Sequence, residues 1–349
     1  MSKSRLALLI HGPFADNCYV QIFKRLQQLP QNVLDKMQII IVGYVSDKPK
    51  IEKVFSTIQI DRNKIKFVFV RDLFNPGYFN INRQVMCVTE GLKSVSGDPV
   101  VIKLRNDQSI NFFKLFTLLK KLNYLPEEYP RIITTNCYTR PDRKYHPSDM
   151  FLCARKRELE QYYDLPISNE THMDVSLKLI NHYQNTGKEM FYFFECPENM
   201  LFQNYLKHKN WLFKNTKIDS YNAIKKYCYI ANTWDIGLCW NKKRTPLLKK
   251  GSIILPYSVA ELSPFPGLPP EKIQCYSRSD FEGSKTTKDR YYLWLSRLCF
   301  TYEYGNRIWS KPEFLKNIYY WGYKLPPNII RLLKFSPLYK IYKWLSKPL

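Results

Sequence analysis

The sequence predicts an α/β protein built on a mainly parallel sheet with helices packed on both faces. Four predominantly apolar runs, separated by helical patterns and turn residues, are the basis of this prediction. Such runs are typical of strands buried on both faces, and strands that alternate with helices favour parallel pairing. The four runs cover residues 6–10, 38–42, 65–70 and 99–104.

Helices are expected between the strands. Residues 17–29 place Val20, Phe23 and Leu26 on one side of a helix, and residues 82–95 repeat apolar side chains at three- and four-residue steps. Beyond residue 130 the pattern is less regular. There we expect short strands at 132–135 and 150–154, helices at 199–208 and 289–299, and mostly loop at 243–288.

These patterns predict three regions along the chain. Residues 1–215 are expected to form the α/β domain, 216–310 an irregular C-terminal portion, and 311–349 a basic, aromatic tail. The 349 residues are enough for one substantial core or two smaller ones. An apolar fraction of 45% is ordinary for a globular protein and excludes general disorder.

The charge and the cysteines narrow the class of protein. A formal net charge of +24 favours phosphorylated ligands, polyanions or an anionic membrane surface as partners. The nine cysteines are scattered without short pairs, which argues against a disulfide framework or a zinc ribbon. No apolar window approaches the roughly 18 residues of a membrane-spanning helix. We therefore expect a cytoplasmic protein with reduced cysteines.

Candidate binding residues follow the predicted strands. Ligands of open parallel sheets bind at the carboxyl ends of the strands, so the polar residues that come directly after each strand are the candidates. They are His11 and Gly12 after the first strand, Tyr44, Ser46 and Asp47 after the second, and Arg105, Asn106 and Asp107 after the fourth.

Asp107 is the most informative of these residues. Its position would place a carboxylate at the ligand-binding edge, where a diphosphate-bound Mg²⁺ or Mn²⁺ needs hard oxygen ligands. The alternative is that Asp107 caps a helix that begins near Ser109. Taken alone, its position slightly favours the cap.

Five short motifs in order resemble the WavE family of lipopolysaccharide- and capsule-synthesis proteins, and with it the GT-A glycosyltransferase core. Each motif is weak alone, but their shared order over roughly residues 6–208 is specific. They are IHGP at 10–13, NINRQ at 80–84 with GLK at 91–93, KLRND at 103–107, HPSD at 146–149, and the Pro197-Glu198 pair that opens a helix.

This resemblance implies a GT-A-like fold and the transfer of a sugar from a nucleotide-diphosphate donor to a surface-polysaccharide or lipid-linked acceptor. It implies that Asp107 binds the metal or the diphosphate and that Arg83 lies near the donor. Asp149 and Glu198 become acceptor-side candidates for a general base. The alternatives are that Asp149 caps a strand and that Glu198 offsets a helix dipole.

Three features depart from the family pattern or remain open. Arg105 stands where many GT-A enzymes carry the first aspartate of their metal motif, which weakens strict metal dependence. Residues 43–46 differ from the family segment that follows the second strand, so it remains open which residues contact the nucleobase of the donor. His146 is interpreted as a surface residue or a supporting contact rather than a metal ligand.

The tail is expected to contact a membrane. Residues 311–349 carry eight Lys or Arg against one Glu, and Leu338, Ile341 and Leu345 share one helical face. Such a segment can lie on an anionic leaflet at the cytoplasmic face, or it can dock on the protein itself. Nucleic-acid binding is an alternative function that the charge permits, but no RRM, KH or helix-turn-helix signature supports it. An inactive GT-A-like scaffold is a third possibility.

Overall fold

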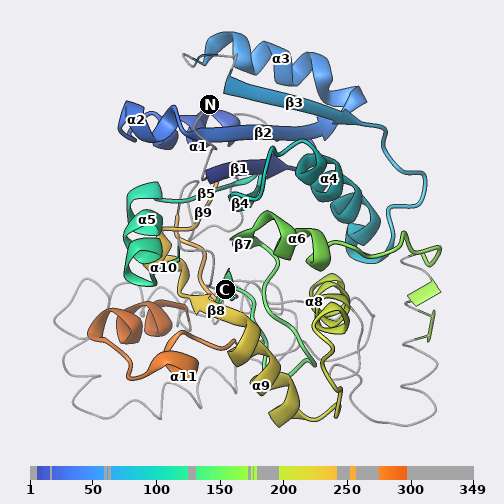
Figure 1. Cartoon of the computed structure of the whole chain (residues 1–349), viewed down its shortest axis with the longest axis vertical. Helices are drawn as coiled ribbons and strands as arrows, with labels where there is room; N and C mark the ends of the chain where they lie inside the picture. The colour runs from blue at the N-terminus through green and yellow to red at the C-terminus, as the bar shows by residue number, and fades with distance from the viewer. Residues whose placement is uncertain are drawn as a thin grey trace, which may run out of the picture. The chain divides into compact units, whose positions relative to one another are not determined.

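The computed structural model describes residues 6–15, 18–58, 61, 64–124, 131–171, 174–175, 177–178, 196–241, 252–256 and 275–296. These residues contain a seven-stranded central sheet with the order β3-β2-β1-β4-β7-β6-β8 (Figure 1). The strands are β1 (Leu6–His11), β2 (Met37–Tyr44), β3 (Ile65–Val70), β4 (Val100–Arg105), β6 (Ile132–Thr135), β7 (Phe151–Arg155) and β8 (Cys228–Ala231).

The sheet is mainly parallel, as the sequence predicts. β1 pairs in parallel with β2 and β4, β2 with β3, and β6 with β8. β7 lies between β4 and β6 and runs antiparallel to both. In this register His11 lies beside Val42 of β2 and Arg105 of β4. The carboxyl ends of three neighbouring strands therefore meet at one edge of the sheet.

Helices cover both faces of the sheet, which confirms the predicted architecture (Figure 1). One face carries α1 (Cys18–Leu26), α3 (Lys48–Thr57) and α5 (Phe112–Lys121). The other face carries α4 (Ile81–Lys93), α6 (Lys156–Tyr162), α8 (Pro197–His208) and α9 (Lys217–Tyr227).

Successive residues of β1 point into two different apolar cores. Leu8 and Ile10 belong to the core on the side of α1, α3 and α5, while Ala7 and Leu9 belong to the core on the side of α4. This alternation is the two-residue period of a strand. Gly91 lets α4 approach closely, since a Cβ there would lie 2.6 Å from Leu9 Cδ1. The first strand of the site is thus buried on both faces.

Two features differ from the sequence-based expectation. β3 lies at an edge of the sheet and is only partly buried, because no strand among the described residues pairs with its outer side. The central sheet also takes β8 from beyond residue 215, and residues 1–299 form one compact unit. The region expected to be irregular from residue 216 onward therefore contributes α9 and β8 to the main body.

Short elements complete the described part of the chain. β5 (Gln108–Ser109) pairs with β9 (Cys239–Trp240) in a two-stranded sheet, and residues 287–296 are helical. None of the helices in the described ranges is long and apolar enough to cross a bilayer. The predicted tail at 311–349 lies outside the described residues. The remaining short helices are α2 (Gln31–Leu34), η1 (Val45–Asp47), η3 (Tyr78–Asn80), α10 (Thr233–Ile236) and α11 (Ser279–Glu282).

Candidate functional site

The loops after β1 and β4 are joined at the carboxyl edge of the sheet. The backbone N–H of Asn106 donates to the carbonyl of His11 at 2.9 Å, and the Asn106 side-chain amide donates to the Pro13 carbonyl. Gly12 has a φ of 130°, and a Cβ there would lie 2.9 Å from Asn106 Oδ1. Glycine is therefore required where these two loops meet, and it leaves the backbone open to close approach.

Asp47 connects the end of β2 to the same edge. Its Oδ2 accepts the backbone N–H of Phe14 at 2.9 Å, so the loop after β2 holds the loop after β1. Ser46 is exposed beside it in η1. Tyr44 ends β2 as a buried residue, and burial raises the pKa of its phenol. The structure thus joins Asp47 to the loop after β1.

Asp107 is buried at the end of β4 and forms an ion pair with Arg105. Arg105 Nη2 lies 3.0 Å from Asp107 Oδ2, and its Nε donates to Oδ1 at 3.2 Å. The Arg105 guanidinium also lies 5.5 Å from the ring centroid of Trp240 in β9. The Asp107 side chain is 5% exposed, whereas that of Arg105 is 40% exposed. Arg105 is therefore an accessible cation held on two sides.

The alternative reading of Asp107 as a helix cap is wrong. β5 follows Asp107 directly, and α5 begins only at Phe112. The cap is Asn111, whose Oδ1 accepts the backbone N–H of Lys114 at 3.0 Å. Because a different residue caps the helix, the buried carboxylate of Asp107 is not explained by helix capping.

His11 is a neutral imidazole at this edge. Burial lowers the pKa of His11 well below its usual value, and the positive charges of Lys103 and Arg105 lower it further. A neutral imidazole can donate one hydrogen bond and accept another. His11 can therefore contact an uncharged polar group of a ligand.

Arg83 is paired at the end of β3. Its Nε and Nη2 donate to the two carboxylate oxygens of Asp72, each at 2.7 Å, and its Nη1 donates to Asn80 Oδ1 at 3.0 Å. Sequence reasoning did not single out Asp72, although it follows β3 at the position where ligand-binding residues are expected. Arg83 thus lies on the β3 side of the edge, away from β4 in the strand order.

Lys103 is the most unexpected residue of the site. It lies inside β4 with no exposed surface, and its Nζ donates to the backbone carbonyl of Asp149 at 2.5 Å. Burial lowers the pKa of Lys103 to about 8, while the carboxylates of Asp149, Glu198 and Asp107 act in the opposite direction. Lys103 therefore lies among the three carboxylates that the sequence nominates. A lysine within an otherwise apolar strand was the signal that could have identified it.

Asp149 is held beside Lys103 by α4. The Gln84 side-chain amide donates to Asp149 Oδ2 and also to the Tyr163 hydroxyl, the latter at 3.3 Å. The Lys103 ammonium lies 6.0 Å from the Tyr163 ring centroid. Asp149 is buried but accepts a hydrogen bond that orients its carboxylate. Gln84 belongs to the NINRQ motif, although its position beside Asp149 could not be read from the sequence.

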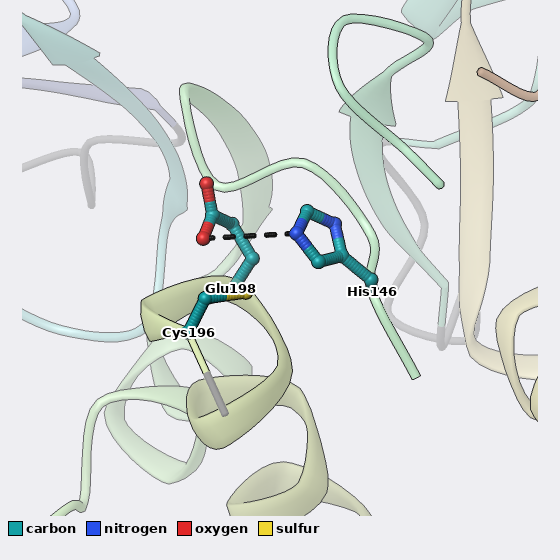
Figure 2. Close-up of side chains that lie close together, drawn as sticks. All are labelled: His146, Cys196 and Glu198. Carbon is teal, nitrogen blue, oxygen red and sulfur yellow. Dashed lines mark ion pairs between the residues drawn. The ribbon is translucent and has the colours of Figure 1, made fainter. Parts of the chain in front are cut away.

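His146 and Glu198 lie next to one another. His146 Nε2 is 3.8 Å from Glu198 Oε2, and Figure 2 shows the His146 ring directed at this carboxylate near the start of α8. The expectation of a surface histidine is wrong, because His146 is buried. Burial lowers its pKa well below the usual value, as do the nearby charges of Arg143 and Arg140. Cys196 completes the cluster and was not singled out from the sequence.

A divalent cation at Asp107 has limited support from these residues. Mg²⁺ and Mn²⁺ sites of nucleotide enzymes use one or two carboxylates together with substrate phosphates. Asp107 supplies one carboxylate, and Arg105 already contacts both of its oxygens. Among the described residues, the one group of three cation-ligating side chains lies instead at His146, Cys196 and Glu198. A cation at Asp107 would have to displace part of the Arg105 ion pair.

Comparison with known protein families identifies one match. Residues 59–227 match the family described as WavE lipopolysaccharide synthesis, which confirms the resemblance inferred from the short motifs. This segment, just under half of the chain, runs from the end of α3 to the end of α9. It contains Arg83, Asp107, Asp149 and Glu198. No curated protein sequence matches the chain.

Several solved structures resemble parts of the chain. A mannosyltransferase from Pyrobaculum calidifontis, in complex with GDP-Man and Mn²⁺, is 11% identical over 50% of this chain and 52% of its own, with a TM-score of 0.31. TarS 1–349 from S. aureus, in complex with UDP-GlcNAc, is 15% identical over 45% and 46%, with a TM-score of 0.30.

A third structure belongs to another class of enzyme. The 4-diphosphocytidyl-2C-methyl-D-erythritol synthase from Anaerococcus prevotii is 12% identical over 64% of this chain and 97% of its own, with a TM-score of 0.30. The chain spans about half the length of the first two structures. TM-scores near 0.3 are too low to carry an inference about substrate or activity.

Proposed function

We propose, from the match of residues 59–227 to the WavE lipopolysaccharide synthesis family, that the protein is a glycosyltransferase. It would transfer a sugar from a nucleotide-diphosphate donor to a surface-polysaccharide or lipid-linked glycan. The observation that carries this proposal is the cluster at the carboxyl ends of β1, β2 and β4, with the ion pair between the buried Asp107 and the accessible Arg105 at its centre. Ligands of open α/β sheets bind at this edge.

The donor diphosphate would bind at Arg105 and Gly12. A guanidinium suits phosphate oxygens because it offers paired donors in a plane. Asp107 and Trp240 already hold the guanidinium of Arg105, so little side-chain freedom is lost on binding. Asp107 remains the predicted ligand of a Mg²⁺ or Mn²⁺ ion, which would neutralise the leaving diphosphate together with Arg105. Asn106 supports the loop that carries Gly12.

The nucleoside end of the donor would lie toward β2 and β3. Tyr44 ends β2, Ser46 and Asp47 follow it, and His11 offers a neutral imidazole at the end of the neighbouring β1. Arg83 is proposed to contact the donor from the start of α4. Because Asp72 accepts hydrogen bonds from both Nε and Nη2 of Arg83, a contact between Arg83 and the donor would require that this ion pair be shared or displaced.

The acceptor would be activated by Asp149. In an inverting transfer a carboxylate takes the proton of the acceptor hydroxyl as the oxygen attacks the anomeric carbon. Gln84 orients the Asp149 carboxylate, and the Lys103 ammonium holds the Asp149 backbone by donating to its carbonyl. Glu198 is the alternative base, because it lies in the same polar cluster and is partly exposed.

The proposal is tested by the variant Asp107→Asn. We expect transfer to fall by at least about 100-fold, because a group that stabilises the leaving diphosphate is lost. Asp98→Asn is the matched control, since Asp98 lies beyond the opposite end of the same strand. Donor binding is measured by thermal shift with UDP- and GDP-sugars, and transfer is measured with the donor that binds.

Three outcomes are distinguishable. Near-normal transfer by Asp107→Asn would refute the site assignment. Donor binding without any turnover in the wild-type protein would identify an inactive scaffold. Binding of single-stranded nucleic acid in place of any nucleotide-sugar would favour the alternative function that the charge of +24 permits.

We also propose that the protein acts at the cytoplasmic face of a membrane through the tail at 311–349. Each lysine near an anionic surface contributes roughly 1 kcal/mol, and salt screens this contribution. Truncation near Lys324 should release the protein from anionic vesicles while nucleotide-sugar binding is retained. Vesicle binding that survives the truncation would place the membrane contact elsewhere.

A further inference from the structure

Three side chains of different chemistry lie close together on the proposed acceptor side. A nitrogen of His146, the sulfur of Cys196 and a carboxylate oxygen of Glu198 all lie within 4.8 Å of one another. Figure 2 shows Cys196 and Glu198 at the start of α8, with the His146 ring facing them from a separate segment. The cluster thus joins two segments that are about 50 residues apart in the sequence.

The distances are close to those of a four-coordinate metal site. Zinc bonds of about 2.0 Å to nitrogen or oxygen and 2.3 Å to sulfur place the tetrahedral ligand atoms of such a set roughly 3.3–3.5 Å apart. His146 Nε2 and Glu198 Oε2 are 3.8 Å apart. Small rotamer adjustments would therefore bring the three donor atoms to coordination distance.

The three side chains differ in their exposure to solvent. His146 and Cys196 are buried, and Cys196 directly precedes α8. Glu198 is 26% exposed, so the site has access to solvent on that side.

The surrounding positive charge does not exclude a cation. Arg140 and Arg143 lie near His146, but Arg140 is itself paired with Asp142, with Nε to Oδ1 at 3.1 Å and Nη2 to Oδ2 at 2.5 Å. A thiolate and a carboxylate would together supply two negative charges to the cation. The net charge of the three ligands would therefore favour the binding of a divalent cation.

We propose that His146, Cys196 and Glu198 bind a thiophilic divalent cation such as Zn²⁺, with a fourth position open to water or substrate. The sulfur ligand sets this site apart from a site for Mg²⁺ or Mn²⁺, which prefer oxygen ligands. Three protein ligands with one open position are typical of zinc sites that take part in catalysis.

The cation would lie close to the proposed acceptor side. The Glu198 carboxylate acts on the pKa of Lys103, as does that of Asp149, so the cluster adjoins the buried lysine. A carboxylate that binds a cation is a poor general base, because the metal competes with the proton. Metal binding at Glu198 would therefore leave Asp149 as the base.

The test uses the full-length protein after metal removal by a chelator and titration with Co²⁺, a spectroscopic substitute for Zn²⁺. We expect one Co²⁺ per chain, with a thiolate-to-metal charge-transfer band and intense visible bands of a four-coordinate site. Added Zn²⁺ should abolish these bands. Cys196→Ser should remove the thiolate band, and Glu198→Gln should weaken Co²⁺ binding by at least about tenfold.

Two matched controls separate this site from other cysteines and histidines. Cys275→Ser changes a partly buried cysteine elsewhere, and His208→Gln changes the histidine at the other end of α8, which pairs with Asp164 at 3.1 Å. Both should bind Co²⁺ like the wild type. Asp107→Asn should also keep the bands, so failure of the donor-site proposal would not affect this result.

Clear outcomes would overturn the proposal. These are the absence of a thiolate band in the wild type, a band that survives Cys196→Ser, or unchanged Co²⁺ affinity in Glu198→Gln. Circular dichroism checks the fold of each variant. If Cys196→Ser does not fold, Glu198→Gln decides the question, because Glu198 is partly exposed in the first helical turn and its replacement by glutamine preserves shape.

Discussion

Replacing Lys103 by methionine should change how the stability of the protein depends on pH. Lys103 is fully buried in β4, and its ammonium donates to the Asp149 carbonyl. Burial lowers the pKa of this lysine from 10.5 to about 8 in the folded protein. In the unfolded chain the lysine is exposed, so its pKa returns to about 10.4.

The direction of this pH dependence follows from how many protons the folded and unfolded proteins bind. Between pH 8 and pH 10.5 the unfolded protein binds more protons at Lys103 than the folded protein, so the free energy of unfolding rises with pH. Below pH 8 the free-energy cost of burying the Lys103 ammonium is fully present, and this cost disappears as the pH passes 10.5. For the shift from 10.5 to about 8, the wild-type protein should gain roughly 2–3 kcal/mol from this lysine between pH 7 and pH 10.

Urea unfolding at pH 7, 8, 9 and 10 measures this contribution as a difference between the wild type and Lys103→Met. Other titrating groups are common to both proteins and largely cancel in the difference. Lys66→Met is the matched control, because Lys66 is an exposed lysine in the edge strand β3. Parallel pH profiles for the wild type and Lys103→Met would refute the placement of a buried, charged lysine among the site carboxylates.

Three other variants test separate contacts. Gly12→Ala should destabilise the fold by roughly 1–3 kcal/mol in urea unfolding, because alanine is strained at a φ of 130° and its Cβ would crowd Asn106; an unchanged midpoint would contradict this loop geometry. Asn111→Ala should cost about 1 kcal/mol through loss of the α5 cap without changing donor affinity. Asp149→Asn should lower kcat by about 10²–10⁴-fold with little change in donor binding; a lower Tm alone would show a purely structural role.

The strands and most helices could be predicted from sequence because burial on both faces leaves a direct pattern. The run at residues 6–10 is apolar throughout, since β1 lies in the middle of the sheet between two layers of helices. The helix at 82–95 was predicted because its buried positions repeat with helical spacing. The exposure of β3 could not be predicted, since position at the edge depends on strand order rather than on local composition.

The donor side of the candidate site was also accessible to sequence reasoning. Residues that follow parallel strands lie at one edge in any fold of this class, so His11, Asp47 and Asp107 could be nominated without coordinates. The choice between site residue and helix cap for Asp107 could not be made in this way. It depended on β5, which pairs with β9 about 130 residues later and delays the start of α5 until Asn111 can cap it.

The sequence by itself therefore determined the layered α/β architecture and the residues at the strand ends. The tertiary structure alone decided which of these residues meet. Lys103 becomes a buried partner of Asp149 because β7 pairs antiparallel with β4 and brings the HPSD loop over it. His146 faces Cys196 because α8 and the segment that carries His146 pack on the same face of the sheet. Local propensity acts over a few residues, whereas these contacts join segments separated by about 50 residues and arise only when the cores form.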